Sequence, residues 1–274
     1  WHHLFTEHHD IIAHAKTTED ILDAKKNNKV AIIFGFQNSA PIANDIFLIE
    51  KFFEAGVRFM QLTYNNQTPL AGGCFEPKDS GVSRFGKAVI EEMNRLGMIV
   101  DLSHAGKQTC LDAIEFSNKP VAISHANPNF FHKSKRNIDT DILQKLVKKN
   151  GFIGLSLYPY HLKNLGDCTI EDFCEMIKGL VNLIGEDNIG IGSDLCLNWS
   201  DDVVMWMRNG KWTKNIDYGE SKDKNPKWPK LPSWYKQPSD LNNLFYLMCE
   251  NNIPEKVSTK IIGQNWFNFM KNQF

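Results

Sequence analysis

Two histidines and an aspartate follow three short apolar runs of the sequence. The runs read Val100-Asp101-Leu102-Ser103-His104, Ala122-Ile123-Ser124-His125 and Gly190-Ile191-Gly192-Ser193-Asp194. If the runs are parallel strands of one barrel, their C-terminal ends converge on one mouth, so His104, His125 and Asp194 would face a shared pocket. Imidazole and carboxylate groups bind zinc, and a catalytic zinc needs about three such ligands and a position open to water. A single histidine after a strand is usually structural, but the three together favour a metal site whose bound water could attack an amide.

Other polar residues near these runs have two interpretations each. Asp101 and Ser103 either orient His104 or simply close their strand, and we favour the structural role. His161 follows another apolar run, where a solvated loop histidine is commoner than a spare ligand. A cluster of histidines near the start of the chain is better explained as a partly exposed helix face than as a metal-binding tract: His2, His3, His8, His9 and His14.

Short apolar runs alternate with longer amphipathic segments, which is the pattern of a parallel sheet covered by helices. Six runs are apolar on both faces and are predicted as buried strands: Val30 to Phe36, Val57 to Thr63, Met98 to Leu102, Val121 to Ser124, Phe152 to Leu157 and Ile189 to Gly192. Apolar residues at three- and four-residue spacing predict helices over Ile42 to Glu54, Lys87 to Leu96, Lys107 to Phe116, Thr140 to Lys149 and Ile170 to Ile184. Thr169 and Asp172 are spaced as a capping box for the last of these.

A chain of 274 residues fits one α/β domain spanning residues 1–274. Six strands do not close a (β/α)8 TIM-type barrel, so either the sheet is open or the first two strands are absent from this chain. We favour the second interpretation, with Trp1 to Ala24 as the helix that follows an absent strand. Residues 209–238 are rich in Lys, Pro and Trp and lack periodicity, which predicts a long loop that is a lid, a subunit contact or a solvated insertion.

Composition excludes several classes of protein. The formal net charge is -1 and no long basic block occurs, so nucleic acid is not an expected partner. Six cysteines without a C-x-x-C pair are typical of reduced thiols in a cytoplasmic protein. No run approaches the roughly 18 apolar residues of a membrane span.

Several motifs in a fixed order carry a resemblance to a known family. They are Gly56-Val57-Arg58-Phe59-Met60-Gln61-Leu62-Thr63-Tyr64-Asn65, Glu92-Met93-Asn94-Arg95-Leu96-Gly97, Val100 to His104, Ser124-His125-Ala126-Asn127, Lys135-Arg136-Asn137, Ile191-Gly192-Ser193-Asp194 and Gly263-Gln264-Asn265-Trp266. Together they resemble the renal (membrane) dipeptidases, metallopeptidase family M19, and a bacterial-type member in particular. The resemblance covers the chain from about Val30 to about Asn268.

The resemblance implies a metal-dependent hydrolase barrel whose typical members cleave dipeptides with two zinc ions. His104 and His125 match the two histidines that ligate one zinc. Asp194 matches the aspartate associated with the other metal and the attacking water. Arg136 matches the arginine that holds the substrate carboxylate, a role that suits a planar guanidinium fork. A homodimer is also implied, because members of the family commonly dimerise.

The sequence departs from the family pattern at three places. The glutamate that bridges the two metals is replaced by Gln37, and a neutral amide cannot offset the charge of two dications. The His-x-Asp pair of the first strand has no counterpart in the sequence. A histidine that contacts substrate corresponds to Tyr64, whose phenol can still donate a hydrogen bond to a developing oxyanion.

These observations leave two main functional hypotheses. In the first, the protein is a zinc-dependent dipeptidase acting on dipeptides or related N-acyl amino acids, with zinc bound by His104, His125, Asp194 and Gln37, and one ion favoured over two. Asp194 and Tyr64 would be catalytic, and Arg136 and Tyr64 would bind substrate. In the second, a catalytically impaired barrel binds a peptide-like or amino-acid ligand, which the replacement at Gln37 supports. A cofactor-free lyase or isomerase that uses the same barrel mouth is a third hypothesis without a motif of its own.

Overall fold

The computed structural model describes residues 1–209 and 227–274 and has an α/β fold built on a parallel sheet. Six strands lie side by side in chain order: β3 (Phe34–Phe36), β4 (Val57–Gln61), β5 (Ile99–Asp101), β6 (Ala122–Ala126), β7 (Phe152–Leu155) and β8 (Ile189–Ile191). Every neighbouring pair is parallel, and β5 and β7 are buried along their whole length. The predicted parallel sheet is therefore confirmed.

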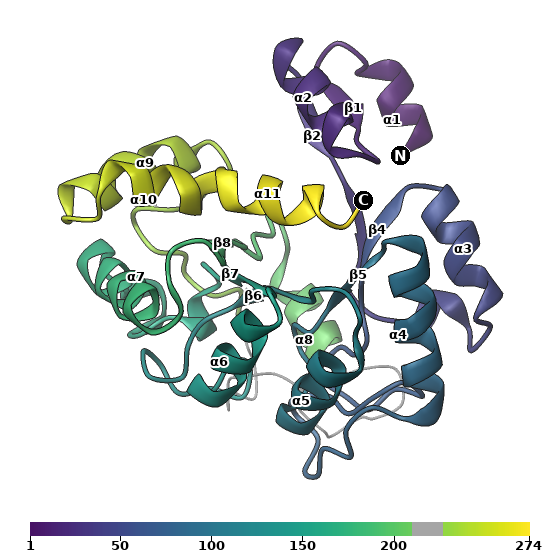
Figure 1. Cartoon of the computed structure of the whole chain (residues 1–274). Helices are drawn as coiled ribbons and strands as arrows, with labels where there is room; N and C mark the ends of the chain where they lie inside the picture. The colour runs from purple at the N-terminus through teal and green to yellow at the C-terminus, as the bar shows by residue number, and fades with distance from the viewer. Residues whose placement is uncertain (210–226) are drawn as a thin grey trace.

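Helices follow most of these strands and cover the outside of the sheet (Figure 1). They are α3 (Phe47–Glu54), α4 (Arg84–Leu96), α5 (Lys107–Phe116), α6 (Thr140–Lys148), α7 (Ile170–Ile184), α8 (Asp201–Asn209), α9 (Asp240–Glu250), α10 (Glu255–Thr259) and α11 (Asn265–Lys271). Short 3₁₀ turns occupy Ala40–Ile42, Pro159–His161 and Leu165–Asp167, and a π-helical segment spans Lys260–Gln264. The side chain of Thr169 caps α7 by accepting a hydrogen bond from the Asp172 amide, which is one of the two hydrogen bonds of the predicted capping box.

Two predictions about where elements begin and end are wrong. The helix predicted from Ile42 begins only at Phe47, because Ala43 and Asn44 adopt left-handed φ angles of 47° and 62° that a right-handed helix cannot contain. The run Val30 to Phe36 is two strands, β2 (Val30–Ile32) and β3, which belong to different sheets. Its two halves pair with different partners, so one continuous apolar run becomes two elements.

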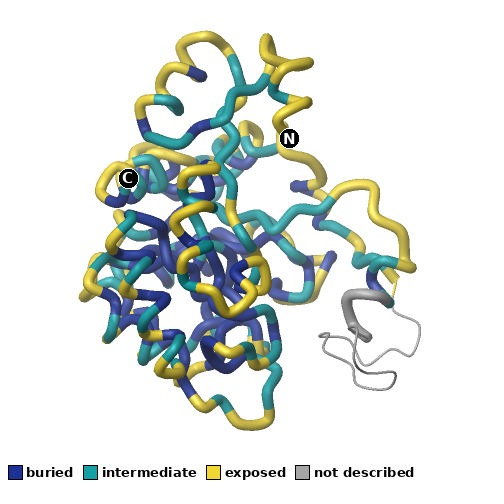
Figure 2. The backbone as a smooth tube through the Cα atoms, turned by 90° about the vertical axis from the view of Figure 1, so that its right-hand side faces the viewer, coloured by how far each residue is buried: buried dark blue, intermediate teal, exposed yellow. Residues whose placement is uncertain are grey.

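The opening segment is not the single helix predicted over Trp1 to Ala24. It forms α1 (His2–Glu7), β1 (Ile12–His14) and α2 (Thr18–Lys26), and β1 pairs in parallel with β2. A capping box at Thr17 starts the second helix afresh, because the Thr17 side chain accepts from the Asp20 amide and the Asp20 carboxylate accepts from the Thr17 amide. This unit projects from the main body and is largely exposed, whereas buried residues concentrate in the body (Figure 2).

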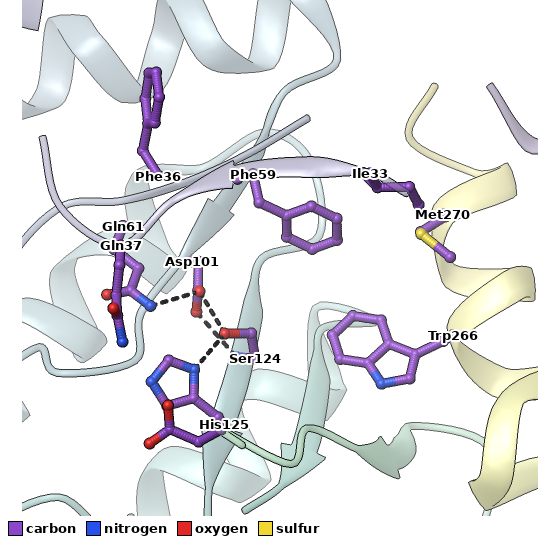
Figure 3. A pocket seen from close by; sticks show the side chains of 12 residues that line it. Ile33, Phe36, Gln37, Phe59, Gln61, Asp101, Ser124, His125, Trp266 and Met270 are labelled. Carbon is purple, nitrogen blue, oxygen red and sulfur yellow. Dashed lines mark hydrogen bonds between the residues drawn. The ribbon is translucent and has the colours of Figure 1, made fainter. Parts of the chain in front are cut away.

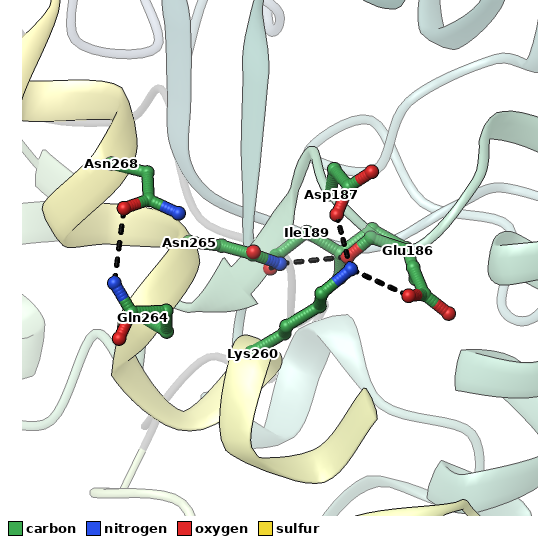
Figure 4. Close-up of polar contacts among 7 residues, drawn as sticks. All are labelled: Glu186, Asp187, Ile189, Lys260, Gln264, Asn265 and Asn268. Carbon is green, nitrogen blue, oxygen red and sulfur yellow. Dashed lines mark hydrogen bonds and ion pairs between the residues drawn. The ribbon is translucent and has the colours of Figure 1, made fainter. Parts of the chain in front are cut away.

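Side chains of the C-terminal segment cover the outer edge of β8. The Asn265 amide donates hydrogen bonds to the carbonyls of Glu186 and Ile189, and the Trp266 indole donates to the carbonyl of Ile191. Lys260 forms ion pairs with Glu186 and Asp187 beside them (Figure 4). In the described part of the chain, β3 and β8 are the two edges of the sheet and do not pair with each other. The C-terminal side chains thus satisfy carbonyls that a further strand would otherwise pair.

The long loop predicted over residues 209–238 falls partly on residues 210–226, which lie outside the described residues. In its last part, Trp234 and Tyr235 are buried, and the Trp234 indole donates to the Cys168 carbonyl. This end of the loop therefore packs against the body, while the lid or subunit contact stays a prediction. No helix within residues 1–209 and 227–274 has both the length and the apolar character needed to cross a bilayer.

Candidate metal centre

A cavity of about 390 Å³ lies between the sheet and the C-terminal helix α11. One end of the cavity is apolar, and its lining includes Phe59, Trp266 and Met270 (Figure 3). The other end is polar and is formed by side chains at or just after the C-terminal ends of strands: Gln37, Gln61, Asp101, Ser124, His125 and Asp194. Convergence of strand ends therefore brings three of the predicted site residues, Gln37, His125 and Asp194, to one cavity.

The imidazoles of His104 and His125 face each other at the polar end. Their Nε2 atoms are 3.1 Å apart, and the two residues are only 5% and 8% exposed. The Nδ1 atom of His104 lies 2.7 Å from Asn65 Oδ1, and that of His125 lies 2.8 Å from Ser124 Oγ. Because Asn65 Oδ1 can only accept, His104 carries its proton on Nδ1 and keeps its Nε2 lone pair available.

The spacing of the two imidazoles fits one zinc ion. Two nitrogens bound to tetrahedral zinc at 2.0–2.1 Å lie roughly 3.3 Å apart. The observed 3.1 Å between the two Nε2 atoms is close to that value. Two bare nitrogen lone pairs that face each other at this distance repel, and a bound cation turns that repulsion into attraction. The donor chemistry of this pair therefore suits zinc.

Burial keeps both imidazoles neutral, which is the form that binds metal. Desolvation, reinforced by the positive charge of Arg136, holds the pKa of His104 well below its ordinary value. The pKa of His125 is also lowered, first by desolvation and then by Arg136, although the nearby carboxylate of Asp194 acts in the opposite direction. Neither imidazole needs to lose a proton before it can ligate at neutral pH.

Asp194 lies in the same cavity as His125 and acts on it electrostatically. Within residues 1–209 and 227–274, however, no three His, Cys, Asp or Glu side chains are grouped closely enough to hold an ion. The structure therefore brings the two imidazoles together, while the role of Asp194 as a third ligand stays a prediction.

Gln37 and Tyr64 flank His104. The Gln37 amide nitrogen is 3.5 Å from His104 Nε2, so the residue in the predicted bridging position does lie beside the imidazole pair. The ring of Tyr64 stacks on that of His104 with centroids 4.1 Å apart. The structure thus places both side chains at the site, and their chemical roles stay predictions.

Arg136 is buried behind His125, with 2% of its surface exposed. Its Nη2 atom donates to the His125 carbonyl over 3.3 Å. In the described part of the chain its guanidinium has no carboxylate partner within ion-pair distance. A buried guanidinium without a counter-ion is costly, so its position favours an anionic ligand.

Three residues of the site have left-handed backbone conformations. Asn65, His104 and Asp194 have φ angles of 59°, 67° and 51°, and each follows the end of a strand. This conformation is uncommon for residues other than glycine, and it concentrates where the surrounding structure holds functional side chains. The left-handed turns redirect these residues after the regular strand has ended.

Two contacts at the site escaped the sequence analysis, and one interpretation is wrong. Asn65 and Ser124 hold the imidazoles, yet neither residue type is a metal ligand that a search for histidine and carboxylate would find. Asp101 bonds to Ser103, Ser124 and Gln61 rather than to His104. His161 is not a solvated loop residue, because it is 1% exposed and its Nδ1 lies 2.7 Å from Ser156 Oγ.

Sequence comparison connects the chain with dipeptidases. Residues 1–199 match the family model described as Membrane dipeptidase (Peptidase family M19). An uncharacterized dipeptidase of Schizosaccharomyces pombe is 32% identical over 186 residues, which cover 64% of this chain and 44% of that protein. Dipeptidase aclJ of Aspergillus oryzae is 31% identical over 170 residues, covering 61% of this chain and 40% of the relative. The chain therefore spans less than half the length of these curated relatives.

Solved structures share the fold. An amidohydrolase from Pseudomonas aeruginosa superposes with a TM-score of 0.91 and 32% identity, covering 99% of this chain and 81% of that one. A metallo peptidase from Rhodobacter sphaeroides, liganded with a phosphinate mimic of the dipeptide L-Ala-D-Ala, has a TM-score of 0.81 at 19% identity, covering 100% and 72%. The likeness confirms the TIM-type α/β barrel class predicted from the sequence.

Proposed function

The chain belongs to the membrane dipeptidase family, peptidase family M19, and from this premise we propose that it is a zinc-dependent dipeptidase acting on dipeptides or related N-acyl amino acids. The observation that carries the proposal is the pair of buried, neutral imidazoles whose Nε2 atoms face each other at 3.1 Å. Their placement at the C-terminal ends of barrel strands, where enzymes of this architecture have their active sites, supports the same conclusion.

His104 and His125 would hold the zinc ion, with the Gln37 amide oxygen and the Asp194 carboxylate as further ligands. Bound zinc would polarise the scissile carbonyl and acidify the attacking water. Asp194 accepts a proton from that water as its oxygen adds to the carbonyl carbon. The C–N bond then breaks, and the amine leaves with the proton that Asp194 returns. Tyr64 donates its phenolic hydrogen to the oxyanion that develops on the carbonyl.

Arg136 would bind the carboxylate at the C-terminal end of the substrate. Its burial, and the lack of a carboxylate partner among the described residues, leave its guanidinium unneutralised. A carboxylate that enters the site would form a charge-assisted, bidentate contact with it. This contact restricts substrates to peptides or N-acyl amino acids with a free carboxylate near the scissile bond.

Gln37 favours one zinc ion over two. A glutamate between two dications contributes a negative charge, whereas the Gln37 amide contributes none. The same replacement supports the alternative proposal, a barrel that binds a peptide-like ligand without hydrolysing it. The two proposals differ in turnover, so a measurement of turnover in the zinc-loaded protein decides between them.

The decisive experiment strips the full protein of metal, reloads it with zinc, and measures bound zinc together with hydrolysis of a dipeptide panel. We expect about one zinc per chain and measurable hydrolysis, with both lost in the variant His125→Ala. The variant His3→Ala is the matched control, because His3 is exposed and does not line the cavity. If the zinc-loaded protein binds dipeptides but hydrolyses none of them, the dipeptidase proposal is wrong and the proposal of a ligand-binding barrel remains.

A second measurement tests the carboxylate contact. Arg136→Ala should raise KM for dipeptides with a free carboxylate and should not raise it for their C-terminal amides. An equal KM for wild type and variant with free dipeptides would remove Arg136 from substrate binding.

Cellular location and assembly are also part of the proposal. All six cysteines lie within the described residues and none forms a disulfide, and the cytoplasmic location stays a prediction from the sequence. The homodimer stays a prediction, which light scattering on the purified protein would check.

A further inference from the structure

Two consecutive residues of β6, Ser124 and His125, both line the cavity (Figure 3). In a regular strand, successive side chains point to opposite faces of the sheet. One of the two should therefore point outward, against the helices. Their shared direction requires a local departure from strand geometry.

The departure is a β-bulge. Ala122 and Ile123 pair in register with Phe152 and Ile153 of β7, but the next pair is Ala126 with Leu155. Ser124 and His125 therefore stand opposite a single residue, Gly154. An extra residue of this kind bends the strand and redirects its side chains, and such bulges are common next to active sites.

Two glycines make room for the bulge. A Cβ atom at Gly154 would lie 2.1 Å from the Ser124 carbonyl oxygen, and one at Gly192 would lie 1.7 Å from the same atom. Any other residue at either position would push the Ser124 backbone away. The bulge in β6 thus depends on a glycine in β7 and on a glycine that directly follows β8. It turns Ser124 toward its neighbour His125.

Within the bulge, Ser124 connects His125 to a buried carboxylate. Ser124 Oγ lies 2.5 Å from Asp101 Oδ2 and 2.8 Å from His125 Nδ1. Asp101 also accepts from the Ser124 amide and from the Gln61 side chain, which fixes the carboxylate in place. A carboxylate can only accept, so the Ser124 hydroxyl must donate to Asp101 and its oxygen then accepts from His125 Nδ1–H.

We propose that Ser124, oriented by Asp101, is a positioning residue that holds the proton of His125 on Nδ1 and keeps its Nε2 lone pair directed at His104. The other tautomer would place a hydrogen on Nε2, between the two imidazoles, and would block the metal. The effect of this tautomer on zinc binding rests on the proposed function. The position of the proton on His125 is independent of that function, because it is a property of the metal-free protein.

The test uses the full chain without metal and reads the tautomer of His125 from long-range ¹H–¹⁵N correlations of its imidazole. Wild type should show a protonated Nδ1 and a bare Nε2. Ser124→Ala should give a mixture of tautomers, and Ser124→Thr, which keeps a hydroxyl, should restore the wild-type spectrum. Ser117→Ala is the matched control, because the Ser117 hydroxyl is also hydrogen-bonded within the structure, to Asn94 and to the Lys119 carbonyl.

Zinc affinity, measured by competition with a chelator, is the second readout. Loss of a group that orients a ligand typically weakens metal binding by about 10- to 100-fold. We expect a loss of this size in Ser124→Ala, recovery in Ser124→Thr, and wild-type affinity in Ser117→Ala.

A second variant covers the case in which Ser124→Ala does not fold. In Asp101→Asn the new amide can donate to Ser124, so the hydroxyl can turn and donate to Nδ1, which moves the proton of His125 to Nε2. A wild-type tautomer and zinc affinity in the folded Ser124 or Asp101 variants would overturn the positioning role. If no form of the protein binds zinc, the proposed function is wrong, and the tautomer still decides the role of Ser124.

Discussion

Gly192→Ala tests whether the geometry around β6 controls the metal site. Gly192 directly follows β8 and donates its amide hydrogen to the Leu155 carbonyl. It contacts neither imidazole through a side chain, since it has none. Any effect of the substitution on metal binding must therefore pass through the backbone that it displaces.

The magnitude follows from one distance. The added Cβ would lie 1.7 Å from the Ser124 carbonyl oxygen, whereas real Cβ contacts essentially never fall below 3.0 Å. The backbone of the bulge must therefore move by about 1 Å or more, and it cannot deform freely in a close-packed interior. Overpacking of this kind costs about 1–3 kcal/mol of folding stability. Because the displaced segment includes His125, zinc affinity should fall by at least about 10-fold, the lower end of the effect of disturbing a ligand's support.

Two assays on the same samples measure these effects. Urea unfolding of the metal-free protein gives the change in folding free energy, and chelator competition gives the zinc dissociation constant. The matched control is Gly263→Ala, because a Cβ at Gly263 meets no atom within 4 Å. In a helical segment the control should be neutral or stabilising by up to about 1 kcal/mol, with wild-type zinc affinity.

The reasoning is refuted if Gly192→Ala unfolds at the wild-type urea concentration and binds zinc with wild-type affinity. A loss of folding stability with unchanged zinc affinity would refute only the proposed coupling between the bulge and the direction of the His125 side chain.

Three further predictions concern charge in the buried site and at the cysteines. At pH values below 6.5, the ordinary pKa of a histidine, the imidazole of His104 takes up a proton in the unfolded chain but not in the native one. This one group should therefore lower the unfolding free energy of the metal-free protein by about 1.4 kcal/mol for each pH unit of acidification. Urea midpoints between pH 7 and 5 should therefore fall less steeply in His104→Gln, and equal slopes would contradict the pKa shift. Gln37→Glu introduces a negative charge about 3.5 Å from His104 Nε2 and should tighten zinc binding at least several-fold, which chelator competition would show; weaker binding would argue against zinc at this position. Burial raises the pKa of Cys110, so its thiol should react with a thiol reagent at pH 8 far more slowly than the partly exposed Cys249, as peptide mapping would reveal.

Local patterns predicted most of the elements, because strands and helices reflect the spacing of apolar residues along the chain. The same patterns misled where pairing decides the outcome. Val30 to Phe36 is a single apolar run, yet its halves join different sheets. Trp1 to Ala24 contains helical spacing, yet a strand and a second helix form there. The strand β1 pairs with β2, and Thr17 is the N-cap of the second helix, α2.

Residue types alone established which side chains could bind a metal, since imidazole and carboxylate groups at successive strand ends are chemically suited to it whatever their exact positions. Only the tertiary structure decided how they are aimed. The left-handed turn at His104 and the bulge that brings Ser124 beside His125 depend on neighbouring strands, and so on contacts between residues far apart in sequence. Hydrogen bonds and steric contacts act over a few ångströms in space, and the linear order of residues does not contain those distances until the chain has folded.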